Sequence, residues 1–459
     1  WTAYPMVPAS AATLLKQAGF EVFWDDAVNE GLNFEQWEKR LLKENPDIIV
    51  IETKTPVVKK HWQIINKFKI QNSKSKIVLM GDHVTALPEE SLRNSQVDYV
   101  LTGGDYDFLL LNLANHLAKG EALEPGWWLR SGEPGRTITT TGPFVLNHDL
   151  NFLPFIDREL TRWKLYAYEN SNFSRVPGTF TMAGRDCWWR KSGGCSFCSW
   201  TTIFPQFRVV RPEKLLDEIG QLIKMGIKEV FDDTGTFPVG AWLEEFCQGM
   251  ISRGYNKKIC FGCNMRANAI PNQETYDLMG QAGFRFILYG LESANQATLD
   301  RLNKGENPED IVKAVDMAKK AGLEPHVTCM VGYPWETKQE AEKTLNLARD
   351  LFRRGLIDSL QATIVIPYPG TALFNEAEKQ GWLLTNNWDL YDMSRPVLRT
   401  EMSAEEISGL IKDFYKAILT PKFIFRKLAD GFSNPRIFLY YLRLTKKFFS
   451  KIKDFARIS

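Results

Sequence analysis

The sequence predicts an α/β fold in which an open parallel sheet is followed by a partial (β/α) barrel and a helical C-terminal segment. Two long series of short apolar runs alternating with amphipathic helical patterns support the two sheets. A stretch rich in Gly and Pro separates the two series. The chain ends in helical patterns. We therefore expect four regions, at 1–125, 126–179, 180–375 and 376–459.

Composition limits the class of protein. Hydrophobic residues make up 44% and charged residues 24% of the 459 residues, as in soluble globular proteins of two or three domains. The net charge of +2 offers no electrostatic argument for nucleic-acid binding. Seven cysteines, an odd number, fit a reduced cytoplasm better than a disulfide framework. The sequence contains no apolar run of about 18 residues, so no transmembrane helix is predicted.

Residues 1–125 predict a Rossmann-like domain. Strands are expected at 20–24, 47–51, 76–80 and 99–102, with helices between them. Because the chain starts at Trp1, we expect a missing N-terminal piece that holds the first strand, and no signal peptide can be assessed.

Small and hydroxyl-bearing residues follow these strands, at the edge where such sheets bind ligands. No G-x-G-x-x-G follows a strand, so a dinucleotide is not indicated. A sheet without any ligand stays an alternative. The candidate ligand-contacting residues are Thr53, Lys54, Thr55, Gly81, His83, Val84, Gly103 and Gly104.

Residues 126–179 are predicted to be a linker. Residues 137–141 predict an edge strand, and residues 151–157 an extended crossing segment. The aromatic content is high for a solvated linker, so we expect this region to pack between the two domains.

A cysteine-rich loop opens region 180–375, with Cys187, Cys195 and Cys198 spaced C-x7-C-x2-C. Three thiolates this close suit a soft metal centre. A 4Fe–4S cluster held by three cysteines keeps one iron open for a small molecule. Zinc normally takes four protein ligands, and no His, Asp or Glu follows Cys187 within the motif. We favour the iron–sulfur cluster, and keep zinc and plain core cysteines as alternatives.

Strand–helix units repeat after this loop, with strands expected at 229–231, 259–264, 286–290, 324–331 and 360–366. Barrels carry their functional residues at the strand C-termini. Asp232, Asp233, Arg266, Glu292, Ser293 and Glu336 fall there. Solvated loop residues are the alternative interpretation. A separate pair, Cys260 and Cys263, is predicted to be structural, since buried free cysteines behave as small hydrophobes.

The order of these motifs resembles the radical S-adenosylmethionine (SAM) superfamily, and within it the branch with an N-terminal cobalamin-binding domain. Beyond the cysteine loop, the matching pieces are FILYGLES at 286–293, LNKG at 302–305, VGYPWET at 331–337 and PYPGT at 367–371. With the N-terminal domain they cover about residues 1–400. The superfamily usually has C-x3-C-x2-C, so the first gap is four residues longer here.

The resemblance implies that SAM binds the open iron and is reductively cleaved to a 5′-deoxyadenosyl radical. It assigns one set of residues to SAM: Phe197, Asp232, Asp233, Thr234, Arg266, Glu292, Ser293, Val331, Gly332 and Pro367. It also implies cobalamin on the N-terminal sheet, at the candidate residues given above. No Asp-x-His-x-x-Gly occurs, so no histidine is placed as a lower cobalt ligand. His83 is nearest by location, although a histidine bonded to backbone is the simpler interpretation.

The expected activity is methylation of an unactivated carbon by a cobalamin-dependent radical SAM enzyme. A radical SAM cyclase or isomerase that binds cobalamin without methyl transfer stays open. So does a 4Fe–4S electron-transfer or scaffold protein. Expected partners are a small-molecule, hydrophobic or lipid substrate and an electron donor such as flavodoxin or ferredoxin, with no nucleic acid.

Region 376–459 is predicted to hold a segment that caps the barrel and a helix over 403–419. The tail at 435–458 is rich in aromatic and basic residues. It is predicted to pack on the core as an amphipathic helix, or else to contact a membrane surface. The expected location is the cytoplasm, with membrane association as the alternative.

Overall fold

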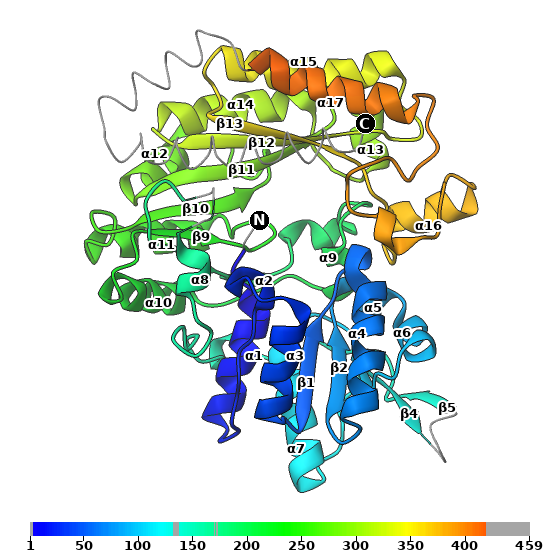
Figure 1. The fold of residues 1–459 in the computed structure, drawn as a ribbon. Coiled ribbons are helices and arrows are strands. Elements are labelled where there is room, and N and C mark those ends of the chain that lie inside the picture. Colours follow the sequence, from blue (N-terminus) through cyan, green and yellow to red (C-terminus); the bar gives the residue numbers. More distant parts are fainter. Residues whose placement is uncertain (1–2, 132–136, 169, 171–172, 419–459) are drawn as a thin grey trace.

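The computed structural model describes residues 3–131, 137–168, 170 and 173–418. Two α/β units follow one another along the chain (Figure 1). The strands β1 to β5 belong to the first unit, and six later strands form the sheet of the second. The predicted tail at 435–458 lies outside the described residues.

The first sheet has the order β1-β2-β3-β4-β5 and is mixed. Its strands are β1 (Ile48–Glu52), β2 (Lys76–Met80), β3 (Tyr99–Leu101), β4 (Trp127–Ser131) and β5 (Thr137–Thr140). The first three pair in parallel, as predicted, and the last two are antiparallel. The sheet therefore continues past residue 125 into the stretch predicted as a linker, where the edge strand expected at 137–141 is confirmed.

The strand expected at 20–24 is wrong, because residues 18–26 have no regular structure. Exposure alternates from Glu21 to Trp24, but the segment pairs with no strand of the sheets among the described residues. Trp24 is held instead by its indole N–H, which donates to the hydroxyl of Tyr166 at 3.3 Å.

Helices cover both faces of the first sheet. They are α1 (Met6–Gln17), α2 (Ala27–Glu30), α3 (Phe34–Glu44), η1 (Thr55–Val57), α4 (Val58–Gln71), α5 (Asp82–Ala86), α6 (Pro88–Asn94) and α7 (Tyr106–Lys119). Because side chains alternate along a strand, Val78 and Met80 pack under α1 and α7. Ile77 and Leu79 pack in the larger core that includes α4.

The second sheet has the order β13-β12-β11-β10-β9-β6 and is parallel throughout. Its strands are β6 (Gly178–Thr181), β9 (Glu229–Asp232), β10 (Cys260–Met265), β11 (Phe284–Glu292), β12 (Glu324–Val331) and β13 (Ser359–Ile364). The five predicted strands are confirmed, and β6 adds a sixth. The end strands β13 and β6 do not pair with each other, so the barrel is incomplete, as predicted.

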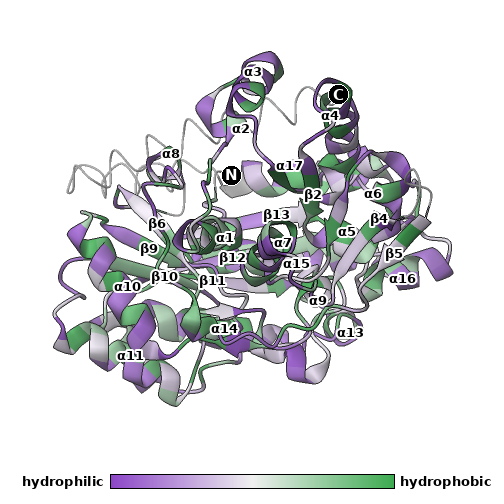
Figure 2. Ribbon diagram, turned by 90° about the horizontal axis from the view of Figure 1, so that it is seen from below, coloured by the Kyte–Doolittle hydropathy of each residue, from purple (hydrophilic) through white to green (hydrophobic). Residues whose placement is uncertain are grey.

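The helices of the second unit pack outside its sheet, with hydrophobic and hydrophilic residues both present along α10 and α11 (Figure 2). They are η3 (Leu150–Phe152) and α8 (Lys164–Ala167) in the linker, then η4 (Trp188–Ser192), α9 (Trp200–Ile203), α10 (Pro212–Lys224), α11 (Ala241–Ser252), α12 (Gln273–Gln281), α13 (Gln296–Arg301), α14 (Pro308–Lys320), α15 (Lys338–Arg353), α16 (Ala372–Lys379), η5 (Trp388–Leu390) and α17 (Ala404–Ile418). Capping boxes at Asn307 and Thr337 begin α14 and α15.

A buried group of charges joins the two units. Asp105, which directly precedes α7, is fully buried. It pairs with Arg208 of β8 (Arg208–Val209) at 2.6 Å and with Arg185 of β7 (Gly184–Arg185) at 3.6 Å. Arg185 also pairs with Asp107 at 2.7 Å. Although burial opposes ionisation, His148 and the two arginines hold the pKa of Asp105 at about 2.

The segment after the barrel returns to the first unit. The indole N–H of Trp388, in η5, donates to Glu90 of α6 at 2.8 Å. Lys59 of α4 donates to Asn387 at 2.9 Å. This segment therefore contacts the first unit, and its role as a cap on the barrel stays a prediction.

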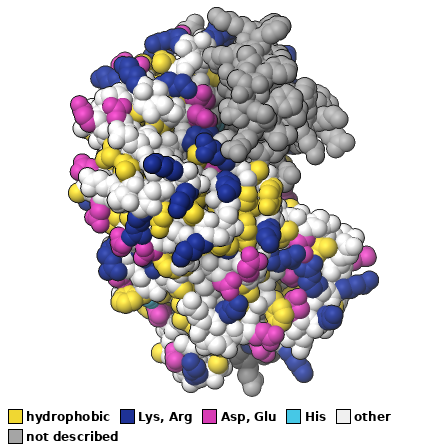
Figure 3. All heavy atoms as spheres, turned by 90° about the vertical axis from the view of Figure 1, so that its left-hand side faces the viewer, with side chains coloured by type: hydrophobic (Ala, Val, Ile, Leu, Met, Phe, Trp, Pro, Cys, Tyr) yellow, Lys and Arg dark blue, Asp and Glu magenta, His cyan; other side chains and the backbone are white. Residues whose placement is uncertain are grey.

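Charges on the face drawn in Figure 3 are interspersed rather than grouped by sign, which fits the net charge of +2. Within the described ranges, the structure contains no helix long and apolar enough to cross a membrane.

We predict that Asp105→Asn lowers the free energy of unfolding by about 3 kcal/mol, because Arg185 and Arg208 stay buried while losing a charged partner. Denaturant unfolding followed by circular dichroism measures this. The matched control is Asp316→Ala, which breaks the exposed Lys320–Asp316 pair and should cost less than about 1 kcal/mol. Equal losses in the two variants would contradict a structural role for the buried group.

We predict that His148 makes stability fall as pH rises past neutrality. Its interaction with Asp105, and further with Glu124, raises the pKa of His148. A raised folded-state pKa contributes stability that is fully present below the unfolded value of about 6.5 and is lost as pH rises through the folded value. Unfolding free energies measured from about pH 6 to about pH 8 should therefore depend less on pH in His148→Gln than in the wild type. Parallel curves would refute the assignment.

Candidate functional site

The three cysteines of the predicted metal loop line one cavity of about 180 Å³. The cavity lies where β10, β11 and β12 supply side chains next to the loop. Three further predicted residues line it as well: Phe197, Arg266 and Glu292. The remaining lining includes Thr236, Asn264 and Lys304, none of which the sequence singled out as a ligand-contacting residue.

The long gap between Cys187 and Cys195 is a single 3-10 turn, η4. Gly193 (φ +89°) and Gly194 (φ +74°) end it in the left-handed conformation that favours glycine. The chain thereby turns back, and Cys195 rejoins Cys187 at the cavity.

Backbone hydrogen bonds fix the loop to two of the matching motifs. The N–H of Ser196 donates to the carbonyl of Leu302 at 2.9 Å, and the N–H of Leu373 donates to the carbonyl of Ser196 at 2.8 Å. The loop is thus attached both to LNKG and to the residues just after PYPGT. These contacts bring motifs that are far apart in the sequence next to the cysteine loop.

The three thiols differ in their surroundings. Burial raises the pKa of Cys195, although nearby Lys304 and Arg266 oppose the shift. Burial also raises the pKa of Cys198, to about 12. Cys187 donates its S–H to the hydroxyl of Thr236 at 3.0 Å. Within the described residues, no group of three or more metal-ligating side chains already surrounds a metal-sized point.

The chemistry of these residues suits a soft metal cluster. Three thiols reach one cavity, and the charged side chains that also line it include cations. The Nε of Arg266 is buried without a hydrogen-bond partner among the described residues. A buried cation with an unused donor, beside thiols that bind metal as thiolates, fits a negatively charged group in this cavity.

Four charged side chains form a balanced group, three of which (Arg266, Glu292 and Lys304) line the cavity. Lys304 lies 3.2 Å from Glu292 and 3.6 Å from Glu306, and Arg266 lies 3.5 Å from Glu306. Burial alone would lower the pKa of Lys304, but the two glutamates outweigh it and raise the pKa. Glu292 has φ +59°, an unusual conformation for a residue with a side chain.

Three of the residues assigned to SAM have structural partners instead. Asp232 is fully buried and accepts hydrogen bonds from the Thr181 hydroxyl and the Ala183 N–H, both at 2.8 Å. The hydroxyl of Thr234 accepts from the Gly184 N–H at 2.8 Å. Ser293 donates to the buried Glu336 at 2.6 Å. We interpret these contacts as holding the strand ends in place behind the cavity.

Asp233 differs from its neighbour. Burial, and next the charge of Asp232, raises the pKa of Asp233 to about 7. Asn264 and the more distant Lys54 oppose this shift. Because Lys54 belongs to the first unit, the strand ends of the two units face each other here. Val331, Gly332 and Pro367 lie outside the cavity lining, and Val331 is fully buried.

The residues assigned to cobalamin comprise five with side chains, most of which are engaged within the first unit, and three glycines. Thr53, Thr55 and His83 are engaged within the first unit: His61 pairs with Thr53 at 2.8 Å, and His83 lies 3.2 Å from Thr55. His83 also contacts Glu90 at 3.1 Å, so both ring nitrogens have side-chain partners rather than backbone ones. Val84 is fully buried.

The glycines in this set are required by close packing. A Cβ on Gly81 would meet the carbonyl oxygen of Thr53 at 2.1 Å. One on Gly103 would meet Phe144, and one on Gly104 would meet Phe204 at 2.1 Å. Lys54 is the residue of this set whose side chain is half exposed.

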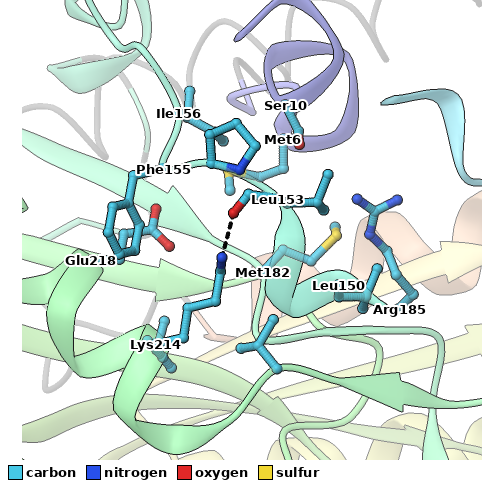
Figure 4. Close-up of a pocket in the computed structure, with 13 residues that line it drawn as sticks. Met6, Ser10, Leu150, Leu153, Phe155, Ile156, Met182, Arg185, Lys214 and Glu218 are labelled. Atoms are coloured by element: carbon cyan, nitrogen blue, oxygen red, sulfur yellow. Dashed lines mark hydrogen bonds between the residues drawn. The ribbon is translucent and has the colours of Figure 1, made fainter. Parts of the chain in front are cut away.

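A second, smaller cavity of about 60 Å³ lies between α1, the linker and α10. Figure 4 shows Lys214 directed at the carbonyl of Leu153. Glu218 there pairs with Arg158 at 2.9 Å. This cavity contains none of the predicted site residues, and its charged groups serve the contact between linker and barrel.

The predicted structural cysteines, Cys260 and Cys263, are both buried in β10 and do not line the larger cavity. Of the lining residues that sequence reasoning missed, Lys304 lies within LNKG and had a signal in that motif. Thr236 and Asn264 had none, because each depends on how neighbouring strand ends are placed.

Comparison with known proteins gives a family match over the cysteine loop and most of the barrel. The Radical SAM superfamily profile matches residues 184–348. An uncharacterized methyltransferase of Pyrococcus horikoshii is 28% identical over 427 residues, which cover 91% of this chain and 89% of that protein. An anaerobic magnesium-protoporphyrin IX monomethyl ester cyclase of Cereibacter sphaeroides is 25% identical over 422 residues, 90% of this chain and 66% of that one.

Solved structures share the fold at low identity. The radical SAM methyltransferase TsrM of Kitasatospora setae has a TM-score of 0.70 at 16% identity, over 92% of this chain and 87% of that one. The cobalamin-dependent SAM radical enzyme OxsB has a TM-score of 0.68 at 17% identity, over 95% and 69%. The profile match at the cysteine loop identifies residues 184–348 as a radical SAM superfamily domain.

Proposed function

We propose that this protein is a cobalamin-dependent radical SAM enzyme that methylates an unactivated carbon of a hydrophobic small molecule. One observation carries the proposal: Cys187, Cys195 and Cys198 share a cavity with Arg266 and Glu292. Thiols for a cluster and charges of both signs for an amino acid-like ligand thus occur at one place.

The chain's own groups divide the work of binding. The three cysteines would hold a 4Fe–4S cluster, which, when bound, supplies the electron that cleaves SAM. Arg266 and Lys304 offer positive charge for a carboxylate, and Glu292 offers negative charge for an amino group. Phe197 packs against the apolar group that contains Tyr333, which closes one side of the cavity to water.

Support for cobalamin comes from side chains at the carboxyl ends of the first sheet's strands. Lys54 is half exposed there, and the neighbouring Glu52 and Asp82 carboxylates outweigh burial and raise the pKa of Lys54. The buried hydroxyl of Tyr106 has no hydrogen-bond partner in the part of the chain that the structure describes. These groups fit a polar cofactor, whereas Gly103 and Gly104 are covered by side chains. The solved structures of TsrM and OxsB with cobalamin bound support the same assignment.

Cyclisation is the second candidate, and a relative favours it. The cyclase of Cereibacter sphaeroides aligns with 90% of this chain, nearly as much as the methyltransferase of Pyrococcus horikoshii. Both candidates need an electron donor of the flavodoxin or ferredoxin kind. A macrocyclic or lipid-like substrate suits either reaction.

We predict that the protein, reconstituted anaerobically with iron and sulfide, forms 5′-deoxyadenosine from SAM when a strong reductant is added. Liquid chromatography with mass detection measures the products. No 5′-deoxyadenosine would refute both candidates and leave an electron-transfer protein. With cobalamin and the true substrate, S-adenosylhomocysteine should form as well, and its absence would favour cyclisation.

We predict that Cys195→Ser binds no 4Fe–4S cluster and loses all SAM cleavage, because two remaining thiols cannot complete the ligand set. Iron content and the visible absorption spectrum measure cluster binding. Cys260→Ala is the matched control, since this thiol is buried in β10 away from the cavity and its loss should leave cluster binding intact. A wild-type spectrum in Cys195→Ser would show that the ligand assignment is wrong.

A further inference from the structure

The first gap of the cysteine motif contains two tryptophans whose role the proposed function does not explain. Trp188 and Trp189 begin η4, and their rings meet edge to face at 6.0 Å. Neither ring simply fills the core, because both are only partly buried. The contacts of the two rings with other residues indicate what they hold in place.

Trp189 is fixed from two sides. Its indole N–H donates to the carbonyl of Asn303 at 2.6 Å. Its ring lies so close to Gly305 that a Cβ there would meet a ring carbon at 2.1 Å. The motif LNKG therefore provides both an acceptor and a flat glycine surface for this one side chain. Such a constrained ring has a defined position relative to the cavity.

Both rings face the same cation. The guanidinium of Arg266 lies 4.4 Å from the centroid of Trp189 and 5.4 Å from that of Trp188. Only 3% of Arg266 is exposed, so this cation–π contact acts with little competition from water. The tryptophans thus restrict where the charge of Arg266 can lie.

The restricted guanidinium points at a predicted cluster ligand. Its Nη1 lies 3.8 Å from the sulfur of Cys195. Its Nη2 donates to the carbonyl of Lys304, and its Nε has no hydrogen-bond partner within the described ranges. One end of the guanidinium is therefore anchored to the backbone, while another faces the thiol.

We propose that Trp188 and Trp189 are positioning residues that hold the Arg266 guanidinium against Cys195, and so raise the reduction potential of the cluster that the three cysteines bind. This inference rests on the proposed function for the presence of the cluster. The inference gives the seven-residue gap between Cys187 and Cys195 a role, because a three-residue gap would have no room for this arrangement of two tryptophans.

The sign follows from electrostatics. Reduction adds one negative charge to the cluster, so a fixed cation beside a ligating sulfur stabilises the reduced form. Lys304 and Glu292 also face this region, and Glu306 pairs with both cations. The four side chains carry two positive and two negative charges, so loss of Arg266 leaves a net negative wall around the cluster.

The test is a potentiometric titration of the reconstituted, cluster-loaded protein, followed by electron paramagnetic resonance of the reduced cluster. Arg266→Gln keeps a planar amide but removes the charge. At a fixed potential, its ratio of reduced to oxidised cluster should fall at least tenfold, which corresponds to about 59 mV for one electron. Lys191→Gln is the matched control, because it removes a positive charge from the same loop at an exposed position and should leave the ratio unchanged.

Trp189→Leu tests the positioning role, because it keeps Arg266 but removes the ring beneath it. It should lower the same ratio, whereas Trp189→Phe retains a ring and should restore most of it. In the double variant with Arg266→Gln, Trp189→Leu should have no further effect, since the tryptophan acts through the arginine. Additive effects would contradict that route.

The outcomes distinguish a failure of the proposed function from a failure of this inference. A wild-type protein that assembles no 4Fe–4S cluster would overturn the proposed function and this inference together. A cluster that assembles but keeps its potential in Arg266→Gln would overturn this inference alone. If Arg266→Gln does not load iron, Trp189→Leu decides: an unchanged potential there also overturns it.

Discussion

Asp105 binds both arginines that flank the cysteine loop, and the position of the loop depends on this contact. Arg185 lies two residues before Cys187, and Arg208 follows Cys198 by ten. The strands β7 and β8 pair with each other and close the base of the loop. A charge at the carboxyl end of the first sheet therefore holds the loop in the second unit.

Packing against glycine reinforces this junction. Phe204, just after α9, lies on Gly104, and a Cβ there would overlap the ring. Gly370, in the PYPGT motif, has the same relation to Ala86 of α5 and Thr202 of α9. Three segments thus meet where the two glycines leave room for the side chains of Phe204, Thr202 and Ala86. Because interiors are densely packed, this junction leaves the loop little freedom to shift relative to either sheet.

The site itself combines rigidity with charge balance. The strand ends behind the cavity are held by buried hydrogen bonds such as Ser293 to Glu336. In front of them, Glu292, Lys304, Glu306 and Arg266 pair with one another. A buried charge is tolerated when it is paired. The cavity can therefore present both signs of charge to a ligand without an unpaired ion in the protein interior.

The sequence by itself determined the parallel strands of the two sheets and the resemblance to the radical SAM superfamily, because apolar periodicity and motif spacing are local properties of the chain. That Cys187, Cys195 and Cys198 are cluster ligands stays a prediction. Only the tertiary structure decided which strand-end residues reach the cavity. Asp232 and Asp233 are adjacent in sequence, yet the first accepts a hydrogen bond from Thr181 of β6, whereas burial and the charge of Asp232 raise the pKa of the second to about 7. The contact between Trp189 and Arg266 likewise depends on the packing of two distant segments. Such pairings arise from packing between strand ends and leave no periodic signal in the chain.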